Sequence, residues 1–586
     1  MEKIGEIKRV NGSLIIAEGL EGVRIGDIAY VGDLRLIGEV VRISGREVAL
    51  QCYEDTSGLR PGEHVISIGM PLVAELGPGL IGGIFDGLER SEIELWKRTG
   101  PFIKKGYRVI PLNREKRWHF KPRVKPGDKV FEGDIIGVVK ESKVIEHRIL
   151  VPIGINGVVE NIEEGDFKVD EPVAEIKLPN GVKREVKLMQ TWPIRVPRPY
   201  KERLPLAQPL FTGQRVIDTF FPIAKGGTAA IPGGFGTGKT VTLHSIAKWS
   251  DADIVIYVGC GERGNEMADI LTHFPELEDP RTGEKLIERA IFIANVSNLP
   301  VSAREASIYV GITMAEYYRD QGYDVGIIVD STSRWAEALR DLSGRLEELP
   351  AEEGYPAYLA ERIAKFYERA GRVVTLGSER RIGSVTIMGA VSPPGGDFSE
   401  PVTSTTMRFV GALWALDTEL AFRRHFPAIN WLRSFSRYVD LLKEFWEKYD
   451  PNWLRFREAA LKLLEESSRL EEIARVIGEK ALPDEQRLIL LVSEILREGF
   501  LVQSAFHEVD RYCPPEKQAK ILRVIVEFYN RASELVRLGV PVERIRGLKN
   551  LVELLRLKEK RKLDEIDEAE KRLVEEMEAL KAEYSR

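Results

Sequence analysis

The pattern of hydrophobic and polar positions changes three times along the chain. The first stretch places short apolar segments, such as residues 13–17 and 36–41, between glycine-containing turns. This pattern predicts a small β-barrel over residues 1–73. A second run of short alternating segments predicts a β-rich insertion over residues 117–186.

Residues 74–116 and 187–436 have a different pattern, in which apolar runs alternate with segments of helical spacing. The runs have the length and composition of strands that are buried on both faces. They are residues 253–258, 290–294, 324–330 and 385–391. Strands of this kind, separated by helices, predict an α/β domain with a largely parallel sheet.

The last region, residues 437–586, predicts a helical domain. Helical spacing covers residues 461–476, 484–497 and 517–538. Gly478 and Pro483 predict a break between the first two of these helices, with the second beginning near Asp484. The tail has 3-4 spacing with the charged residue Glu570 in its seam, which favours a helix packed on its own domain over a coiled coil.

The β-rich insertion contains turns that are typical of biotinyl- and lipoyl-type barrels. Lys-Pro-Gly-Asp begins at Lys125 and Glu-Gly-Asp begins at Glu132. A carrier domain would also need a lysine at a hairpin tip in a Met-Lys-Met or Asp-Lys-Ala setting, and residues 117–186 contain neither sequence. The insertion is therefore expected to be a structural barrel.

Composition narrows the functional classes. A chain of 586 residues with 43% hydrophobic and 30% charged residues is typical of a globular protein of several domains. Its net charge of −6 argues against a general nucleic-acid binder. Neither a membrane span nor a signal peptide is expected, so membrane association would be through partners. Three scattered cysteines and seven ungrouped histidines predict neither a disulfide framework nor a zinc site.

Residues 233–240 read Gly-Gly-Phe-Gly-Thr-Gly-Lys-Thr, which matches the phosphate-loop pattern G-x-x-x-x-G-K-[ST] at every position. An apolar run precedes the loop and helical spacing follows it, as nucleotide binding requires. Lys239 is expected to reach the β- and γ-phosphates, and Thr240 to ligate Mg²⁺. The expected nucleotide contacts are Gly233, Gly234, Phe235, Gly236, Thr237, Gly238, Lys239, Thr240 and Val241.

Two further segments carry candidate chemistry. The apolar strand that ends in Asp330 is typical of the carboxylate that holds Mg²⁺ or its water shell, although such a residue also caps turns. Glu262 and Arg263 follow another strand, where doubly wound sheets place catalytic groups. From the residues alone, two interpretations are equally good. Glu262 could be a water-activating base with Arg263 as a phosphate-binding cation, or the two could form a solvated ion pair in a loop. No Asn-Lys-x-Asp motif is present, which disfavours GTP.

Several motifs in order give the chain a specific resemblance. The phosphate loop is followed by Gly-Cys-Gly-Glu-Arg-Gly-Asn-Glu from Gly259 and by Ser-Thr-Ser-Arg-Trp-Ala-Glu-Ala from Ser331. Residues 392–401 read Ser-Pro-Pro-Gly-Gly-Asp-Phe-Ser-Glu-Pro, and residues 427–436 fit P-x-[LIV]-[DN]-x-x-x-S-x-S. With the β-rich insertion, this order resembles the catalytic A subunits of archaeal and vacuolar-type rotary ATPases over essentially the whole chain. The shorter F-type β subunits lack the insertion.

The resemblance implies roles for individual residues. Lys239, Glu262 and Arg263 would be catalytic, and Thr240 and Asp330 would lie on the metal side. It also implies an adenine pocket, formed by Phe426, Gln503, Ala505 and Phe506. Periodicity alone would place the two phenylalanines in the core. The loop departs from its relatives at Gly234, where Pro or Ala is common, and at Thr237, where Ser or Cys is common. The backbone that binds phosphate is still expected to form. Without a cysteine at position 237, redox control of the loop is not expected.

The resemblance also implies the function and the partners. The chain would interconvert ATP with ADP and phosphate, using Mg²⁺, in an enzyme that moves H⁺ or Na⁺ across a membrane. A non-catalytic B subunit would alternate with it in a hexamer and donate an arginine finger, while central and peripheral stalk subunits would complete the assembly. It would lie peripherally on the cytoplasmic face of the cell membrane. Two alternatives stay open: a regulatory nucleotide-binding subunit of the same ring, and an RNA-translocating hexameric ATPase.

Overall fold

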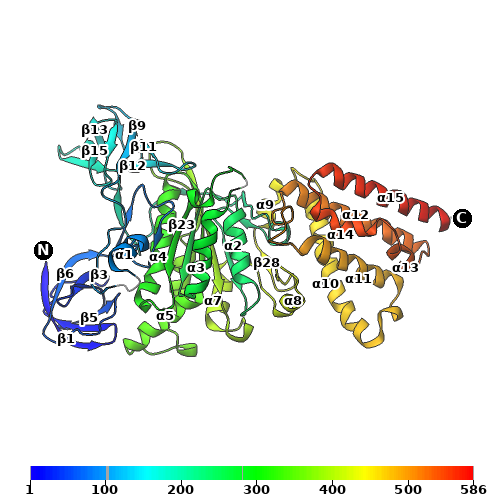
Figure 1. The fold of residues 1–586 in the computed structure, drawn as a ribbon, viewed down its shortest axis with the longest axis horizontal. Helices are drawn as coiled ribbons and strands as arrows, with labels where there is room; N and C mark the ends of the chain where they lie inside the picture. Colours follow the sequence, from blue (N-terminus) through cyan, green and yellow to red (C-terminus); the bar gives the residue numbers. More distant parts are fainter. Residues whose placement is uncertain (1, 101–103, 280, 585–586) are drawn as a thin grey trace. The chain divides into compact units, whose positions relative to one another are not determined.

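The computed structural model describes residues 2–100, 104–279 and 281–584 (Figure 1). The chain divides into two units. Unit 1 contains Met1–Pro205, Ala252–Pro393 and Asp397–Phe409, and unit 2 contains Leu206–Asp251, Pro394–Gly396 and Val410–Arg586. The β-barrel, the β-rich insertion and most of the parallel sheet belong to unit 1, whereas the phosphate loop and the C-terminal helices belong to unit 2.

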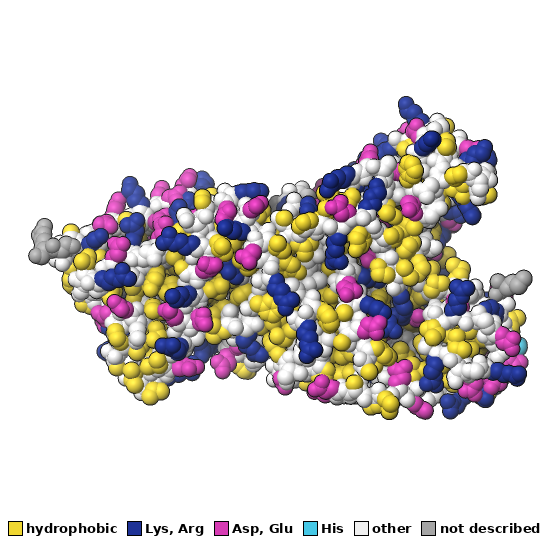
Figure 2. Space-filling model, turned by 180° about the vertical axis from the view of Figure 1, so that it is seen from behind, with side chains coloured by type: hydrophobic (Ala, Val, Ile, Leu, Met, Phe, Trp, Pro, Cys, Tyr) yellow, Lys and Arg dark blue, Asp and Glu magenta, His cyan; other side chains and the backbone are white. Residues whose placement is uncertain are grey.

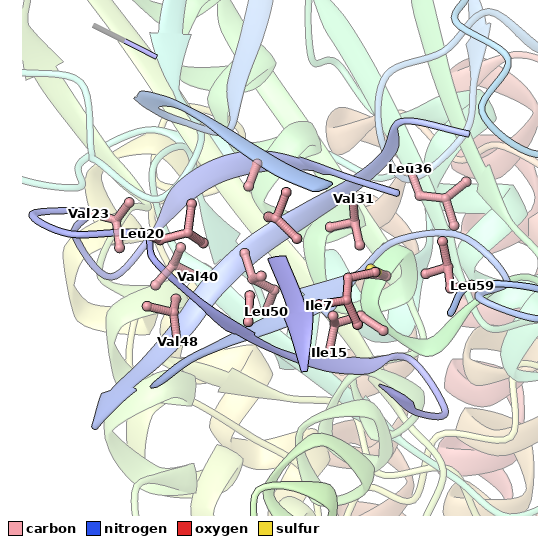
Figure 3. Packing of buried hydrophobic residues seen from close by; sticks show 14 residues of the cluster. Ile7, Ile15, Leu20, Val23, Val31, Leu36, Val40, Val48, Leu50 and Leu59 are labelled. Atoms are coloured by element: carbon pink, nitrogen blue, oxygen red, sulfur yellow. The ribbon is translucent and has the colours of Figure 1, made fainter. Parts of the chain in front are cut away.

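A closed six-stranded barrel forms the start of unit 1, in the order β1-β2-β5-β4-β3-β6. Its strands are β1 (Lys3–Asn11), β2 (Leu14–Glu18), β3 (Asp27–Val31), β4 (Leu36–Ser44), β5 (Glu47–Cys52) and β6 (His64–Pro71). Alternate residues of each strand point inward, and side chains such as Ile15, Val40 and Leu50 fill the interior (Figure 3). A barrel this narrow is packed with side chains, so it supports the fold and leaves no central channel.

The insertion consists of two four-stranded antiparallel sheets, β10-β13-β15-β16 and β12-β11-β9-β14. The strands are β9 (Trp118–Pro122), β10 (Lys129–Val130), β11 (Ile135–Lys140), β12 (Glu146–Leu150), β13 (Gly157–Ile162), β14 (Gly165–Phe167), β15 (Pro172–Lys177) and β16 (Lys183–Lys187). A buried histidine joins the insertion to the rest of unit 1: His147 Nδ1 lies 2.6 Å from Glu141 Oε2, and its Nε2 lies 2.8 Å from the Tyr317 hydroxyl.

The main sheet of unit 1 runs in the order β26-β24-β22-β23-β8, and neighbouring strands are parallel. Its strands are β8 (Ile84–Phe85), β22 (Ile254–Cys260), β23 (Ala290–Asn295), β24 (Asp324–Asp330) and β26 (Ile382–Val391); β25 (Gly371–Val374) pairs with β26, and β18 (Glu202–Arg203) with β25. β7 (Val73–Leu76) and β17 (Gln190–Pro193) form a separate antiparallel pair.

Helices flank this sheet. They are α1 (Glu92–Thr99), α3 (Gly264–His273), α4 (Val301–Asp320), α5 (Thr332–Arg345), α6 (Leu359–Tyr367) and α7 (Pro401–Phe409). Figure 1 labels α1, α3, α4, α5 and α7 among them. β22 is buried along its whole length, and α4 is buried at almost every position. Continuous burial on both faces is the property that the unbroken apolar runs of the sequence predict.

Unit 2 combines three short strand pairings with a helical domain. β21 (Thr228–Pro232) pairs in parallel with β27 (Ala412–Leu413), β27 pairs with β28 (Phe435–Ser436), and β19 (Pro209–Leu210) pairs with β20 (Ile223–Ala224). The helices are α2 (Lys239–Trp249), α8 (Thr418–Phe422), α9 (Val439–Trp446), α10 (Trp453–Ile477), α11 (Asp484–Leu496), α12 (Pro515–Arg537), α13 (Val542–Arg546), α14 (Leu551–Arg556) and α15 (Leu563–Tyr584).

The predicted fold class is confirmed: a β-barrel, a β-rich insertion, an α/β nucleotide-binding region and a helical C-terminal domain. The break between α10 and α11 is also confirmed, because α10 ends before Gly478, whose φ of 87° suits glycine, and α11 begins at Asp484. The helix α15 packs on α12 of its own domain, where the seam residue Glu570 accepts a hydrogen bond from Arg523 at 3.1 Å. The domain limits given above stay a prediction.

No helix among the described residues is long and apolar enough to cross a bilayer. On the face that Figure 2 displays, basic and acidic side chains are interspersed. This mixture agrees with the small net charge of −6 and gives that face no continuous positive field for a polyanion.

Candidate nucleotide-binding site

The phosphate loop connects the buried strand β21 to helix α2 in unit 2. Gly238 is the N-cap of α2, with φ 79° and ψ 21°, and no side chain caps the first turn. That turn also lacks acidic residues, so it carries no carboxylate that would repel phosphate. Its backbone N–H groups and the helix dipole together form a site for an anion.

Glycine is required at some positions of the loop and not at others. A Cβ at Gly233 would lie 2.7 Å from Thr237 Oγ1 and 2.8 Å from Leu416 Cβ, so no larger residue fits there. At Gly234 the nearest atoms would be 3.9 Å away, and a side chain is tolerated. The space at Gly234 therefore fits the expectation that this position can also hold a side chain such as Pro or Ala. Thr237 is buried, and its hydroxyl donates to the Gly234 carbonyl at 2.8 Å, which braces the loop.

A cavity of about 340 Å³ opens beside the loop and the start of α2, also within unit 2. Its walls come from Gln214, the loop, α2 and two later segments, residues 424–427 and 502–506. They are Gln214, Gly236, Gly238, Val241, Thr242, Ser245, Arg424, Phe426, Pro427, Val502, Gln503, Ser504, Ala505 and Phe506. The four residues expected to form an adenine pocket thus line one cavity, next to the glycines of the phosphate loop.

The two phenylalanines are not core residues. Phe506 is 91% exposed and Phe426 is 40% exposed, so the expectation from periodicity alone is wrong for both side chains. Large aromatic faces left open beside a phosphate cradle suit a planar base, because stacking accepts any aromatic ring. Two further predicted contacts, Phe235 and Val241, are exposed as well, whereas Lys239 and Thr240 are half-buried.

Gln503 differs from its neighbours because its side chain is buried. Its Oε1 accepts a hydrogen bond from the backbone N–H of Arg215 at 2.8 Å. Its Nε2 donates to the carbonyl oxygens of Gly213 and Asp510, both at 2.8 Å. Three backbone groups therefore bind the amide, and both hydrogens of Nε2 are used within the protein.

The other candidate catalytic residues lie in unit 1, at the carboxyl ends of two neighbouring strands. In the register of β22 and β24, Gly259 lies opposite Asp330. Glu262 and Arg263 come directly after β22, the first half-buried and the second exposed as the N-cap of α3. The structure thus brings Glu262, Arg263 and Asp330 to one edge of the parallel sheet, where doubly wound folds carry their chemistry.

Asp330 is a buried carboxylate, only 1% exposed. The hydroxyl of Tyr257, on the adjacent strand, donates to its Oδ2 at 3.1 Å. Burial raises the pKa of Tyr257 well above its usual value, and the negative charge of Asp330 adds to this effect. Tyr257 therefore stays protonated and orients the carboxylate, as is common for carboxylates on the metal side of a site.

Sequence reasoning assigned no role to Arg334, which lies near Glu262. A Cβ on Gly261, the residue before Glu262, would lie 2.9 Å from Arg334 Cβ. The pKa of Arg334 is raised mainly by its hydrogen bond to Glu337, and the charge of Glu262 contributes. Arg334 belongs to the Ser-Thr-Ser-Arg segment that begins at Ser331, so the sequence shows the motif. It does not show that Arg334 lies near Glu262.

A preformed metal cage is not visible in the parts of the chain that the structure describes, since they contain no group of three or more His, Cys, Asp or Glu placed to hold an ion. The donor types expected from the sequence still fit Mg²⁺. That ion usually takes one or two protein oxygens and completes its shell with water and substrate phosphates. The residues expected to hold it are Thr240, through its hydroxyl, and Asp330, through its carboxylate.

Four family models match successive parts of the chain. They describe the β-barrel domain of the ATP synthase alpha/beta family (residues 7–69), the ATP synthase alpha/beta subunit barrel-sandwich domain (109–195), the nucleotide-binding domain of the same family (213–436) and the C-terminal domain of V and A type ATP synthase (442–546). The A subunit of the A-type ATP synthase of Thermofilum pendens is 58% identical over 95% of this chain and 93% of its own length. The chain belongs to the A-subunit family of A/V-type ATP synthases.

Other members of this family match the whole length. The A subunit of the A-type ATP synthase of Methanopyrus kandleri is 55% identical over 99% of both chains, and the V-type ATP synthase alpha chain of Thermoanaerobacter pseudethanolicus is 55% identical over 98% of both. Among solved structures, the ATPase EscN of the enteropathogenic E. coli type III secretion system matches with a TM-score of 0.63 over 89% of this chain and 100% of its own, at 22% identity. That likeness concerns the fold alone.

Proposed function

We propose that this chain binds Mg-ATP at the phosphate loop of unit 2 and interconverts ATP with ADP and phosphate. As a member of the A-subunit family, it is a catalytic subunit of an ATP-synthesising and ATP-hydrolysing enzyme that transports ions. The observation that carries the proposal is the uncapped, acid-free start of α2 directly beside a cavity with open aromatic walls. One end binds phosphate and the other accepts a flat base, which is the outline of a nucleotide.

Each residue of the phosphate end has a separate task. Lys239 is the first residue of α2, so its ammonium supplies mobile positive charge where the N–H groups of the loop supply fixed partial charge. Thr240 offers a hydroxyl and Asp330 a carboxylate to Mg²⁺. Bound Mg²⁺ would neutralise phosphate charge, and these two side chains would set its position relative to the nucleotide.

Glu262 is proposed as the base that orients and deprotonates the attacking water, and Arg263 as a cation that steadies phosphate charge. Glu262 is half-buried at the sheet edge, and its backbone carbonyl accepts a hydrogen bond from Ser297 N–H at 2.9 Å, which fixes the chain at that point. A fixed main chain keeps the start of the Glu262 side chain in place when the substrate binds. Arg263 is exposed and therefore accessible to a ligand.

Phe426, Ala505 and Phe506 are proposed to receive the adenine ring. Stacking between aromatic faces stabilises a bound base by roughly 1–3 kcal/mol. Gln503 lines the same pocket, and its buried side chain holds the backbone of the pocket wall in place.

Family membership indicates that this chain works in a complex of several subunits. A/V-type ATP synthases are membrane-associated complexes of several subunits, and this chain is a peripheral member in our proposal. We propose that it alternates in a hexamer with a B subunit that supplies the arginine finger, and that it contacts central and peripheral stalk subunits on the cytoplasmic face of the membrane. Phosphoryl transfer needs such a cation in the transition state, so the chain alone should be a poor ATPase.

The two alternatives are not favoured. A regulatory subunit that binds nucleotide without chemistry has no need of Lys239 together with Glu262, and both are present. An RNA-translocating ATPase would need a positive path for the strand, whereas the visible face of Figure 2 mixes both signs of charge. The relatives at 55–58% identity are named as ATP synthase subunits, not as helicases.

Two substitutions separate binding from chemistry. Lys239→Ala should weaken both ATP binding and turnover, because the lysine acts on the phosphates directly. Glu262→Gln should keep Mg-ATP binding and lower turnover in the assembled ring by at least about 100-fold, the lower range for a general base. Calorimetric titration of nucleotide and steady-state hydrolysis, measured on the same preparations, test both expectations.

Matched controls come from the same elements. Lys248→Ala removes a lysine from the last turn of α2, and Glu276→Gln removes a carboxylate from an exposed turn of unit 1. Both controls should bind and hydrolyse ATP like the unmodified chain. Near-normal turnover of Glu262→Gln would remove this residue from the mechanism.

A further inference from the structure

Arg215 is a buried arginine in unit 2 that none of the roles above uses. Its side chain is 0% exposed, yet it carries a full positive charge. Three groups of one segment satisfy it: Nε donates to the Phe500 carbonyl at 2.6 Å, Nη2 to the Val502 carbonyl at 2.8 Å and Nη1 to Asp510 Oδ1 at 2.7 Å. The planar fork of the guanidinium thus holds both ends of a loop that is 285 or more residues away in sequence.

The loop, residues 502–510, includes the wall of the adenine cavity and contains no regular helix or strand. Asp510 is buried, and while its Oδ1 binds Arg215, its Oδ2 accepts a hydrogen bond from Ser504 N–H at 2.8 Å. One carboxylate therefore connects the arginine to the residue beside Ala505. Inside the loop, the Phe506 N–H donates a long hydrogen bond to the Ser504 hydroxyl, at 3.4 Å.

Gln503 ties the same loop to the other wall of the cavity. Its side-chain amide bonds Arg215 N–H and the carbonyls of Gly213 and Asp510, and its own N–H donates to the Phe426 carbonyl at 2.9 Å. The segment that precedes Arg215 fits closely: a Cβ on Gly213 would lie 2.3 Å from the ring of Tyr512. The wall that carries Phe506 is thus fastened to the wall that carries Phe426.

We propose that Arg215 and Asp510 are positioning residues for the adenine base, with Gln503 as the internal tie of the loop. This inference rests on the proposed function, because it assigns the network to the base end of the same nucleotide site. Phe506 is 91% exposed and has little packing of its own to hold it, so its place beside the cavity depends on how the loop behind it is anchored. Gln503 acts through the loop and does not read the base.

Replacement of Arg215 should therefore affect one end of the nucleotide and spare the other. Lysine at position 215 keeps the charge but presents a single ammonium instead of a fork, so it cannot hold Phe500, Val502 and Asp510 in the same geometry. Arg215→Lys should weaken ATP binding by about 10-fold or more. The affinity for inorganic triphosphate, which has no base and uses only the phosphate loop, should change by less than about 2-fold. Because the change keeps the positive charge and loses only the forked geometry, a difference between the losses of ATP and triphosphate affinity reports on how the loop is positioned.

Arg369 provides a matched control in unit 1. It is also buried, and its fork bonds Glu316 at 2.6 Å and the Ile194 carbonyl at 2.7 Å. Arg369→Lys should lower the melting temperature of the full chain without changing the ratio of the two affinities. Asp510→Asn is the second variant if Arg215→Lys does not fold, since its amide keeps the shape of the carboxylate but turns a donor towards either Arg215 or Ser504. It should change the ratio in the same direction.

The experiment measures the dissociation constants of Mg-ATP and Mg-triphosphate on the full chain by calorimetry, with the melting temperature recorded for each variant. A lower ATP affinity with an unchanged triphosphate affinity supports the proposal. Equal losses for both ligands, or no loss for either, overturn it. Phe506→Ala tests the adenine pocket separately from the positioning role of Arg215. If Phe506→Ala leaves ATP affinity unchanged, the proposed adenine pocket is wrong. If Phe506→Ala lowers ATP affinity but Arg215→Lys binds ATP normally, only the positioning role is wrong.

Discussion

Two glycines of the phosphate loop offer a comparison within the same few residues. Gly236 has a φ of 78° and Gly238 a φ of 79°, both in the left-handed region that disfavours any residue with a Cβ. A Cβ on Gly236 would meet nothing within 4 Å, whereas a Cβ on Gly238 would lie 3.1 Å from Cε1 of Phe426. Alanine at either site brings the same backbone strain, but only alanine at 238 also pushes on the ring.

The expected magnitudes follow from these two terms. Left-handed backbone costs alanine about 1–2 kcal/mol, and if nucleotide binding must restore that conformation, affinity falls by up to about 5- to 30-fold. This loss applies to both variants and to both ATP and inorganic triphosphate, because each ligand uses the loop. The ring of Phe426 must also move in Gly238→Ala, and a lost aromatic contact of about 0.5–1.5 kcal/mol lowers ATP affinity by a further 2- to 12-fold or so.

The decisive quantity is the ratio of the ATP and triphosphate affinities, measured by calorimetry on the full chain. Gly236→Ala should leave this ratio at its native value, and Gly238→Ala should shift it towards triphosphate. An unchanged ratio in Gly238→Ala would refute a stacking role for Phe426. A shifted ratio in Gly236→Ala would show that backbone strain in the loop reaches the base end by another route.

Three further predictions concern other parts of the chain. Burial raises the pKa of Asp218 from 3.8 to about 7. The contribution of this group to the free energy of unfolding is therefore fully present below about pH 4 and is lost as the pH rises to about 7. At 1.36 kcal/mol per pKa unit, the total loss is about 4 kcal/mol. The difference in melting temperature between Asp218→Asn and the native chain should therefore grow in favour of the variant from pH 5 to pH 8, and a difference that is independent of pH would contradict this. We expect residues 479–483, between α10 and α11, to transmit the nucleotide state to the central stalk. Shortening this segment should spare ATP hydrolysis by a ring without the stalk but reduce torque or ion pumping in the whole enzyme. Unchanged torque in single-molecule rotation would contradict this role. Deleting residues 117–186 should lower stability, because it strips the buried contact of His147 from Tyr317, and should impair assembly or coupling while ATP binding is retained; loss of binding in a deletion protein that is otherwise folded would show that the insertion supports the site.

Much of this protein follows from local sequence. The strand and helix on either side of residues 233–240, the break between α10 and α11 at Gly478 and Asp484, and the buried strands were predicted correctly. The reason is that backbone stereochemistry, capping and apolar periodicity act over a few residues and can be read from a single segment. Periodicity alone placed Phe426 and Phe506 in the core, whereas the family resemblance predicts a pocket, and both residues line the cavity beside the loop.

The tertiary structure alone decided which distant residues meet. Arg215 and Asp510 are separated by 295 positions, and neither lies in a pattern that marks it as a partner of the other. The sequence also could not tell that the Gln503 amide would be occupied by three backbone groups, or that Arg334 would lie near Glu262. Buried polar pairing depends on where the chain returns after hundreds of residues. A buried charge must find its partner there, because leaving it unpaired costs more than any local preference can repay.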